Sequence, residues 1–130
     1  MKKFLKFIWV LLAVLISLSS CKKSVTQSSS NDDYYVKYSI KGNGTYIYFS
    51  EFSVNTPQGN KSFSGYQYKS WNQTYGAVKK GFNASVSVNS SLVTVEIYVC
   101  KNNEPFALKA SKSGGSSSTS NVSLSYPINF

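Results

Sequence analysis

The chain has 130 residues and a formal net charge of +9, from fourteen basic residues, all lysine, against five acidic ones. It contains no histidine, so the commonest general base and metal ligand is missing. It also lacks arginine, the residue whose planar fork best matches phosphate and base edges. We therefore expect the protein to be neither an enzyme nor a nucleic-acid-binding protein.

The first twenty residues have the three-part layout of a secretory signal. Lysines come first, an apolar stretch covers residues 7–18, and small residues follow. A membrane-spanning helix needs about 20 apolar residues, so this stretch is too short to cross a bilayer. Residues 1–20 are therefore expected to be a signal peptide that is removed on export.

The tetrapeptide Leu18-Ser19-Ser20-Cys21 at the end of this stretch resembles the lipobox of bacterial lipoproteins. The resemblance implies that the thiol of Cys21 carries diacylglycerol, that the chain is cut just before it, and that the new amine is acylated. Two or three acyl chains hold a protein firmly on a membrane. No other cofactor is expected. The alternative is an ordinary signal peptide cut near Ser19 or Ser20, with Cys21 unmodified.

Residues 21–33 contain one apolar residue, Val25, and are otherwise polar. Such a segment cannot form a core of its own. A flexible linker of this length spans about 20 Å on average. Residues 21–33 are therefore predicted to be a tether that keeps the following domain close to a membrane.

From residue 34 to the end, apolar and polar side chains alternate with a period of two, which is typical of half-buried strands. The segment Ser70–Lys80 is less periodic, with Trp71, Tyr75 and Val78 as expected anchors. About seven strands and no helix predict one antiparallel β-sandwich over residues 34–130. In chain order the expected strands cover residues 35–41, 46–51, 61–68, 82–89, 92–99, 106–110 and 122–126.

Three segments carry a resemblance to a known group: the opening strand Tyr35–Gly42, the turn Lys79–Phe82 and the strand Val93–Val99. They resemble small envelope lipoproteins of Bacteroidota. That group is similar in architecture to the soluble domain of the mycobacterial MmpS-type transport accessory proteins. The resemblance covers most of residues 34–130 and implies an immunoglobulin-like β-sandwich tethered by its N-terminus. It brings no catalytic motif.

The candidate ligand-binding residues are Tyr66, Tyr68 and Trp71, which lie close together in the sequence. Aromatic rings displayed on a sandwich can stack on sugar faces or contact a protein partner. Packing in the core is the alternative for each of them. Cys100 has no partner if Cys21 is lipidated, and it is either a reactive thiol or a small apolar residue at a strand end.

Together these features predict a lipoprotein anchored in the cell envelope, with the outer membrane as the expected location. Its domain is expected to be a non-catalytic accessory or structural module that binds another envelope protein. The alternative is a glycan-binding lipoprotein that uses exposed aromatic residues.

Overall fold

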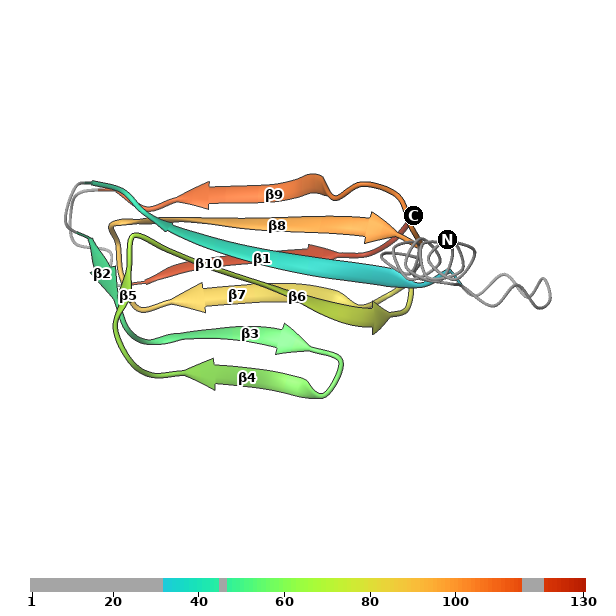
Figure 1. Cartoon of the computed structure of the whole chain (residues 1–130), viewed down its shortest axis with the longest axis horizontal. Helices are drawn as coiled ribbons and strands as arrows, with labels where there is room; N and C mark the ends of the chain where they lie inside the picture. Colours follow the sequence, from blue (N-terminus) through green and yellow to red (C-terminus); the bar gives the residue numbers. More distant parts are fainter. Residues whose placement is uncertain (1–31, 45–46, 116–120) are drawn as a thin grey trace, which may run out of the picture.

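The computed structural model describes residues 32–44, 47–115 and 121–130, and these form ten β-strands without a helix (Figure 1). The strands make two four-stranded antiparallel sheets and one two-stranded antiparallel sheet. The predicted all-β, antiparallel fold is confirmed, with ten strands in place of about seven. In the same residues no helix is long and apolar enough to cross a membrane. The lipobox residues Leu18, Ser19, Ser20 and Cys21 lie outside the described residues.

The first sheet has the strand order β6-β1-β8-β9. Its strands are β1 (Tyr34–Gly42), β6 (Ser70–Val78), β8 (Val93–Lys101) and β9 (Ala107–Ser113). β1 and β8 pair over their whole length, from the start of β1 opposite the end of β8 to Gly42 opposite Val93. These two strands form the centre of the sheet, and β6 and β9 are its edges.

The second sheet has the order β10-β7-β3-β4 and packs against the first. Its strands are β3 (Phe52–Thr56), β4 (Gly59–Phe63), β7 (Asn83–Val88) and β10 (Val122–Pro127). The remaining two strands, β2 (Tyr48–Phe49) and β5 (Gln67–Tyr68), pair with each other at one end of the sandwich (Figure 1).

The core lies between the two large sheets and consists of the apolar side chains that alternate along their strands. Tyr38 is the central aromatic residue: its ring is fully buried, and its hydroxyl donates a hydrogen bond of 2.6 Å to the carbonyl oxygen of Asn55. A buried hydroxyl with a partner avoids the desolvation cost of an unpaired one. The other fully buried large side chains are Tyr34, Ile40, Ile97, Ile128, Val36, Val54, Val88, Val93, Val95, Val99 and Val122.

The segment Ser70–Lys80, in which the alternation indicates no regular strand, contains the nine-residue strand β6. Its weak periodicity has a structural cause, since β6 is an edge strand on the open side of the sandwich. Gln73 faces the inner side of the sheet, opposite the buried Tyr38, and yet is exposed to solvent. A polar residue is therefore accepted where the alternation requires an apolar one.

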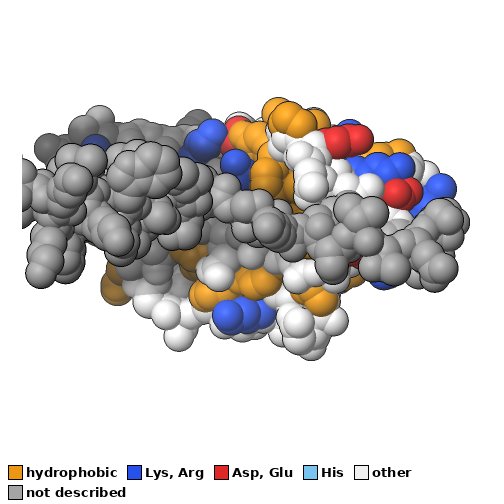
Figure 2. Space-filling view, turned by 45° about the vertical axis from the view of Figure 1, so that its right-hand side comes forward, with side chains coloured by type: hydrophobic (Ala, Val, Ile, Leu, Met, Phe, Trp, Pro, Cys, Tyr) orange, Lys and Arg blue, Asp and Glu red, His pale blue; other side chains and the backbone are white. Residues whose placement is uncertain are grey.

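The start of β1 and the C-terminus meet at one end of the sandwich, which we call the amino-terminal end (Figure 1). There the rings of Tyr34 and Phe130 pack edge to face at 5.5 Å. Two ion pairs fasten the residues before β1, Lys101 with Asp32 at 2.8 Å and Lys79 with Asp33 at 2.5 Å. Figure 2, which turns this end forward, shows lysine, acidic and apolar side chains interspersed over the visible coloured surface.

Glu96 is the centre of a polar network on the outer face of the first sheet. Its carboxylate forms an ion pair with the ammonium group of Lys41 at 2.9 Å and accepts a hydrogen bond of 2.8 Å from the hydroxyl of Tyr98. Burial alone raises the pKa of Glu96, but Lys41 and Tyr98 outweigh it, so the net pKa lies below the ordinary value of 4.5. The ionised carboxylate therefore stabilises the folded state.

We expect Glu96→Gln to lower the free energy of unfolding at neutral pH by roughly 1 kcal/mol, as for a partly exposed ion pair. Because the folded pKa is depressed, the contribution of Glu96 is full above pH 4.5 and is lost as the pH falls through the folded value. Urea unfolding at pH 7 and pH 3 measures the difference in the free energy of unfolding between the variant and the parent. The difference between the variant and the parent should be larger at pH 7 than at pH 3, and a difference that does not shrink as the pH falls below 4.5 would contradict the assignment.

Candidate functional site

The structure separates the three predicted aromatic residues. Tyr66 and Tyr68 lie on the surface, with exposed fractions of 81% and 45%, and Trp71 is half-buried. Tyr48, which the sequence did not single out, lies beside the first two and is 57% exposed. We call Tyr48, Tyr66 and Tyr68 the tyrosine cluster.

The tyrosine cluster is held together by the pairing of β2 with β5. Tyr48 is the direct cross-strand partner of Tyr68, and their ring centroids are 5.0 Å apart with planes inclined by 35°. Tyr66, just before β5, sets its ring edge-on to Tyr48 at 6.3 Å and 87°. Tyr48 and Tyr68 therefore form a tilted stacked pair, and Tyr66 contacts Tyr48 edge to face. Such offset and edge-to-face arrangements are the preferred contacts of aromatic rings.

Lys69 adds a positive charge to this site. Its Nζ atom lies 5.2 Å from the centroid of the Tyr68 ring, within the range of a cation–π contact. The backbone of Lys69 is fixed on both sides: its N–H donates to the carbonyl of Ile47 at 3.2 Å, and its carbonyl accepts from the N–H of Gly42 at 2.6 Å. These hydrogen bonds fix the backbone of Lys69, the residue that joins β5 to β6, beside the tyrosine cluster.

Trp71 has a packing role in the structure. Its ring contacts Phe52 at 4.7 Å and Phe63 at 5.1 Å, and these two phenylalanines stack on each other with an interplanar angle of 6°. The three rings come from β6, β3 and β4 and cover part of the side of the sandwich where both large sheets have an edge, next to the first residues of β6. Trp71 is thus not part of the tyrosine cluster.

A second set of exposed apolar side chains lies on and beside the outer face of the first sheet. Tyr35, Phe106 and Leu108 are 36%, 38% and 52% exposed. Lys37 covers part of this set, with Nζ 4.6 Å from the ring of Tyr98 and 5.4 Å from that of Phe106. The two aromatic residues of this set are less exposed than each of Tyr48, Tyr66 and Tyr68, so this surface presents less exposed aromatic area than the tyrosine cluster.

Cys100 is a free, buried cysteine on β8, opposite Tyr35 of β1. Burial raises the pKa of its thiol above the ordinary value, so the reactive thiolate form is disfavoured at neutral pH. The described residues contain no group of three or more histidine, cysteine or acidic side chains placed to hold a metal ion. The thiol therefore has the character of a small apolar residue.

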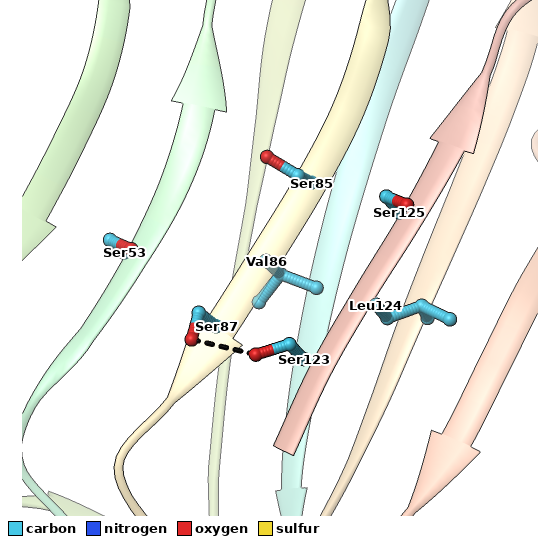
Figure 3. Close-up of a pocket in the computed structure, with 7 residues that line it drawn as sticks. All are labelled: Ser53, Ser85, Val86, Ser87, Ser123, Leu124 and Ser125. Atoms are coloured by element: carbon cyan, nitrogen blue, oxygen red, sulfur yellow. Dashed lines mark hydrogen bonds between the residues drawn. The ribbon is translucent and has the colours of Figure 1, made fainter. Parts of the chain in front are cut away.

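Two shallow hollows lie on the outer face of the second sheet. The first has a volume of about 220 Å³ and is floored by small hydroxyl side chains, with Ser87 and Ser123 hydrogen-bonded at 2.9 Å (Figure 3). The neighbouring hollow, of about 420 Å³, contains one carboxylate, that of Glu51. A single carboxylate among serines and asparagines does not form an acid–base pair. The residues of the first hollow are Ser53, Ser85, Val86, Ser87, Ser123, Leu124 and Ser125.

The chain was compared with protein-family models, curated proteins and solved structures, and no significant match was found in any of the three. The class that the geometry defines is an antiparallel β-sandwich with an exposed tyrosine cluster at one end.

Proposed function

We propose that the chain is a bacterial lipoprotein of the cell envelope, anchored through acyl chains on Cys21, most simply in the outer membrane. Its sandwich, which we take to be immunoglobulin-like, acts as a non-catalytic accessory module that binds another envelope protein. The signal-like residues 1–20, the lipobox and the polar tether support the anchoring. The tyrosine cluster is the proposed recognition surface.

The observation that carries this proposal is the position of the tyrosine cluster. β1 begins at the amino-terminal end of the sandwich, and β2 and β5 lie at the opposite end (Figure 1). A strand of nine residues is about 30 Å long. The cluster is therefore well separated from the point where the proposed tether joins the domain, and the anchor does not obstruct it.

The nature of the exposed side chains also supports a binding role. Tyrosine supplies a large contact area at a low cost in side-chain entropy, together with a hydroxyl that can donate and accept. It is one of the residue types that dominate the binding energy of protein interfaces. On the surface, Tyr48 contacts both Tyr66 and Tyr68, and the three rings form a compact patch of this kind. Buried tyrosines would contribute to the stability of the domain but not to binding.

A glycan is the second candidate ligand. The specific observation in its favour is the stacked pair of Tyr48 and Tyr68, whose side chains are 57% and 45% exposed. A pyranose ring presents an apolar face that can pack on an exposed ring of such a pair, and Lys69 beside it can donate to a sugar hydroxyl. In this version of the site Tyr48 takes the place that the sequence suggested for Trp71.

Photocrosslinking in cells tests the proposed function. A photoreactive phenylalanine analogue in place of Tyr66 should give one discrete protein adduct, and the adduct should disappear when Tyr48→Ala is added. The matched control carries the same analogue at Ser123, on the outer face of the second sheet, and should give no such adduct.

The glycan candidate is distinguished by native electrophoresis in gels that contain soluble envelope polysaccharide. Retardation of the parent chain, lost in Tyr48→Ala, together with no protein adduct at Tyr66 would favour the glycan. Equal adducts at Tyr66 and Ser123, or neither adduct nor retardation, would contradict the assignment of the tyrosine cluster as a recognition surface.

A further inference from the structure

The two large sheets have four edge strands, and three of these carry features that discourage pairing with another chain. β9 has two lysines, Lys109 and Lys112, and its register with β8 shifts between Ile97 and Tyr98. Lysines and irregularities of this kind protect sheet edges.

The other two protected edges are short. β10 has six residues and ends at Pro127, which has no N–H to offer. β4 has five residues, and Lys61 lies opposite the buried Val54, so it is a charged residue on the inner side of an edge strand. Inward-pointing charges also discourage edge-to-edge association.

β6 lacks these features over most of its length. It has nine residues, Ser70–Val78, none of them charged and none of them proline. It is the longest of the four edges. Most of its residues are exposed, and its pairing with β1 is regular from Ser70 to Tyr75. One irregularity lies near its end, where the register with β1 shifts between Tyr34 and Tyr35.

The open side of the sandwich next to β6 contains a buried hydroxyl without a hydrogen-bond partner among the described residues. Trp71, Gln73 and Tyr75 share the inner side of β6, opposite Ile40, Tyr38 and Val36. The hydroxyl of Tyr75 is buried and has no hydrogen-bond partner within the described part of the chain. Buried polar groups are nearly always paired in native proteins, so a further donor or acceptor would be favourable at this hydroxyl.

We propose that β6 pairs antiparallel with β6 of a second copy of the chain. The twofold axis passes midway between the two Gln73 residues, which lie opposite each other. The two four-stranded sheets then become one eight-stranded sheet. This proposal does not depend on the proposed function, since it concerns an edge of the first sheet and neither the tyrosine cluster nor the anchor.

The sequence of β6 is complementary to itself in this register. With Gln73 opposite its own copy, Trp71 lies opposite Tyr75 on the inner side and Asn72 lies opposite Thr74 on the outer side. Aromatic pairs and short polar pairs are favourable across antiparallel strands. The indole N–H of Trp71 becomes a donor on the same side as the unpaired hydroxyl of Tyr75. No like charges meet, because β6 has none.

A second copy is also compatible with anchoring to one membrane. Antiparallel pairing places the two amino-terminal ends at opposite ends of the joined sheet. Asp32 and Asp33 are held by ion pairs, so residues 21–31 would connect each end to the membrane, and a flexible segment of this length spans about 18 Å on average. Both tethers can therefore reach one bilayer when the joined sheet lies along it.

Sedimentation equilibrium of residues 21–130 with Cys21→Ser tests the dimer without acyl chains. Every core residue lies between Tyr34 and Ile128, so this chain keeps its whole core. We expect a concentration-dependent dimer. Gln73→Lys, which sets two ammonium groups together at the twofold axis, should raise the dissociation constant at least about tenfold, because like charges in contact oppose association. Ser111→Lys, an equal charge on the opposite edge strand β9, should leave it unchanged.

A cysteine placed at the axis tests the register. Gln73→Cys should form an intermolecular disulfide under mild oxidation, because directly opposite residues of antiparallel strands have a Cα separation of about 4.5–5.5 Å. Asn60→Cys, on the edge strand β4, is the matched control and should form no intermolecular disulfide. Unchanged circular dichroism shows that each variant is folded. A monomer at all concentrations, a dimer insensitive to Gln73→Lys, or equal crosslinking at both positions would overturn the proposal.

Discussion

In a Gram-negative bacterium, Cys21→Ala is expected to abolish acylation and to move the full-length chain from the membrane fraction to the soluble fraction. Each buried methylene contributes about 0.8 kcal/mol to membrane binding, so the loss of two or three acyl chains changes partitioning by several orders of magnitude. Labelling with a palmitate analogue, followed by fractionation of the cells, measures both effects.

Cys100→Ala is the matched control for this experiment, because it removes the other cysteine of the chain. Cys100 is buried within β8, and it should not be acylated. The control variant should therefore keep the label and stay with the membrane. Labelling of Cys21→Ala at the parental level would exclude the lipobox interpretation.

Tyr38→Ala is expected to cause a large loss of stability, about 3–5 kcal/mol, as for large aromatic residues in other cores. Tyr38 is completely buried, packs at 6.0 Å from the ring of Tyr75, and is hydrogen-bonded to Asn55. Small domains have free energies of unfolding of about 5–15 kcal/mol. The variant should therefore be close to unfolding at 25 °C.

Two controls separate the contributions of Tyr38. Tyr38→Phe keeps the ring and removes only the hydrogen bond to Asn55, so it should cost about 1 kcal/mol. Tyr66→Ala removes a ring that is 81% exposed and should change stability by less than about 0.5 kcal/mol. Urea unfolding measures all three variants. Similar losses for Tyr38→Ala and Tyr66→Ala would mean that the assignment of core and surface is wrong.

The central strands could be predicted because each is buried on one face and the period of two is therefore complete. In β7, and in β8 as far as Val99, every inward-facing residue is apolar, and the structure buries every one of them. β1 follows the same pattern over Val36, Tyr38 and Ile40. In such strands the burial of one face dictates the sequence, and the sequence in turn indicates the strand.

The edges and the site could not be predicted in the same way. β6 is an edge strand with one long edge in solvent. Gln73 on its inner side is therefore exposed, and it interrupts the alternation of apolar and polar residues. Tyr48 joins the tyrosine cluster only because β2 pairs with β5, and it lies eighteen positions before Tyr66 in the chain. Local sequence does not report such pairing. Proximity in sequence groups Trp71 with Tyr66 and Tyr68, but its strand turns it toward Phe52 and Phe63.

The most direct test of the lipid anchor is the intact mass of the exported protein, together with the mass of its N-terminal peptide. The lipoprotein assignment predicts a chain that begins at Cys21 and carries diacylglycerol on the sulfur and an acyl group on the amine. An unmodified N-terminus at any other residue would contradict it.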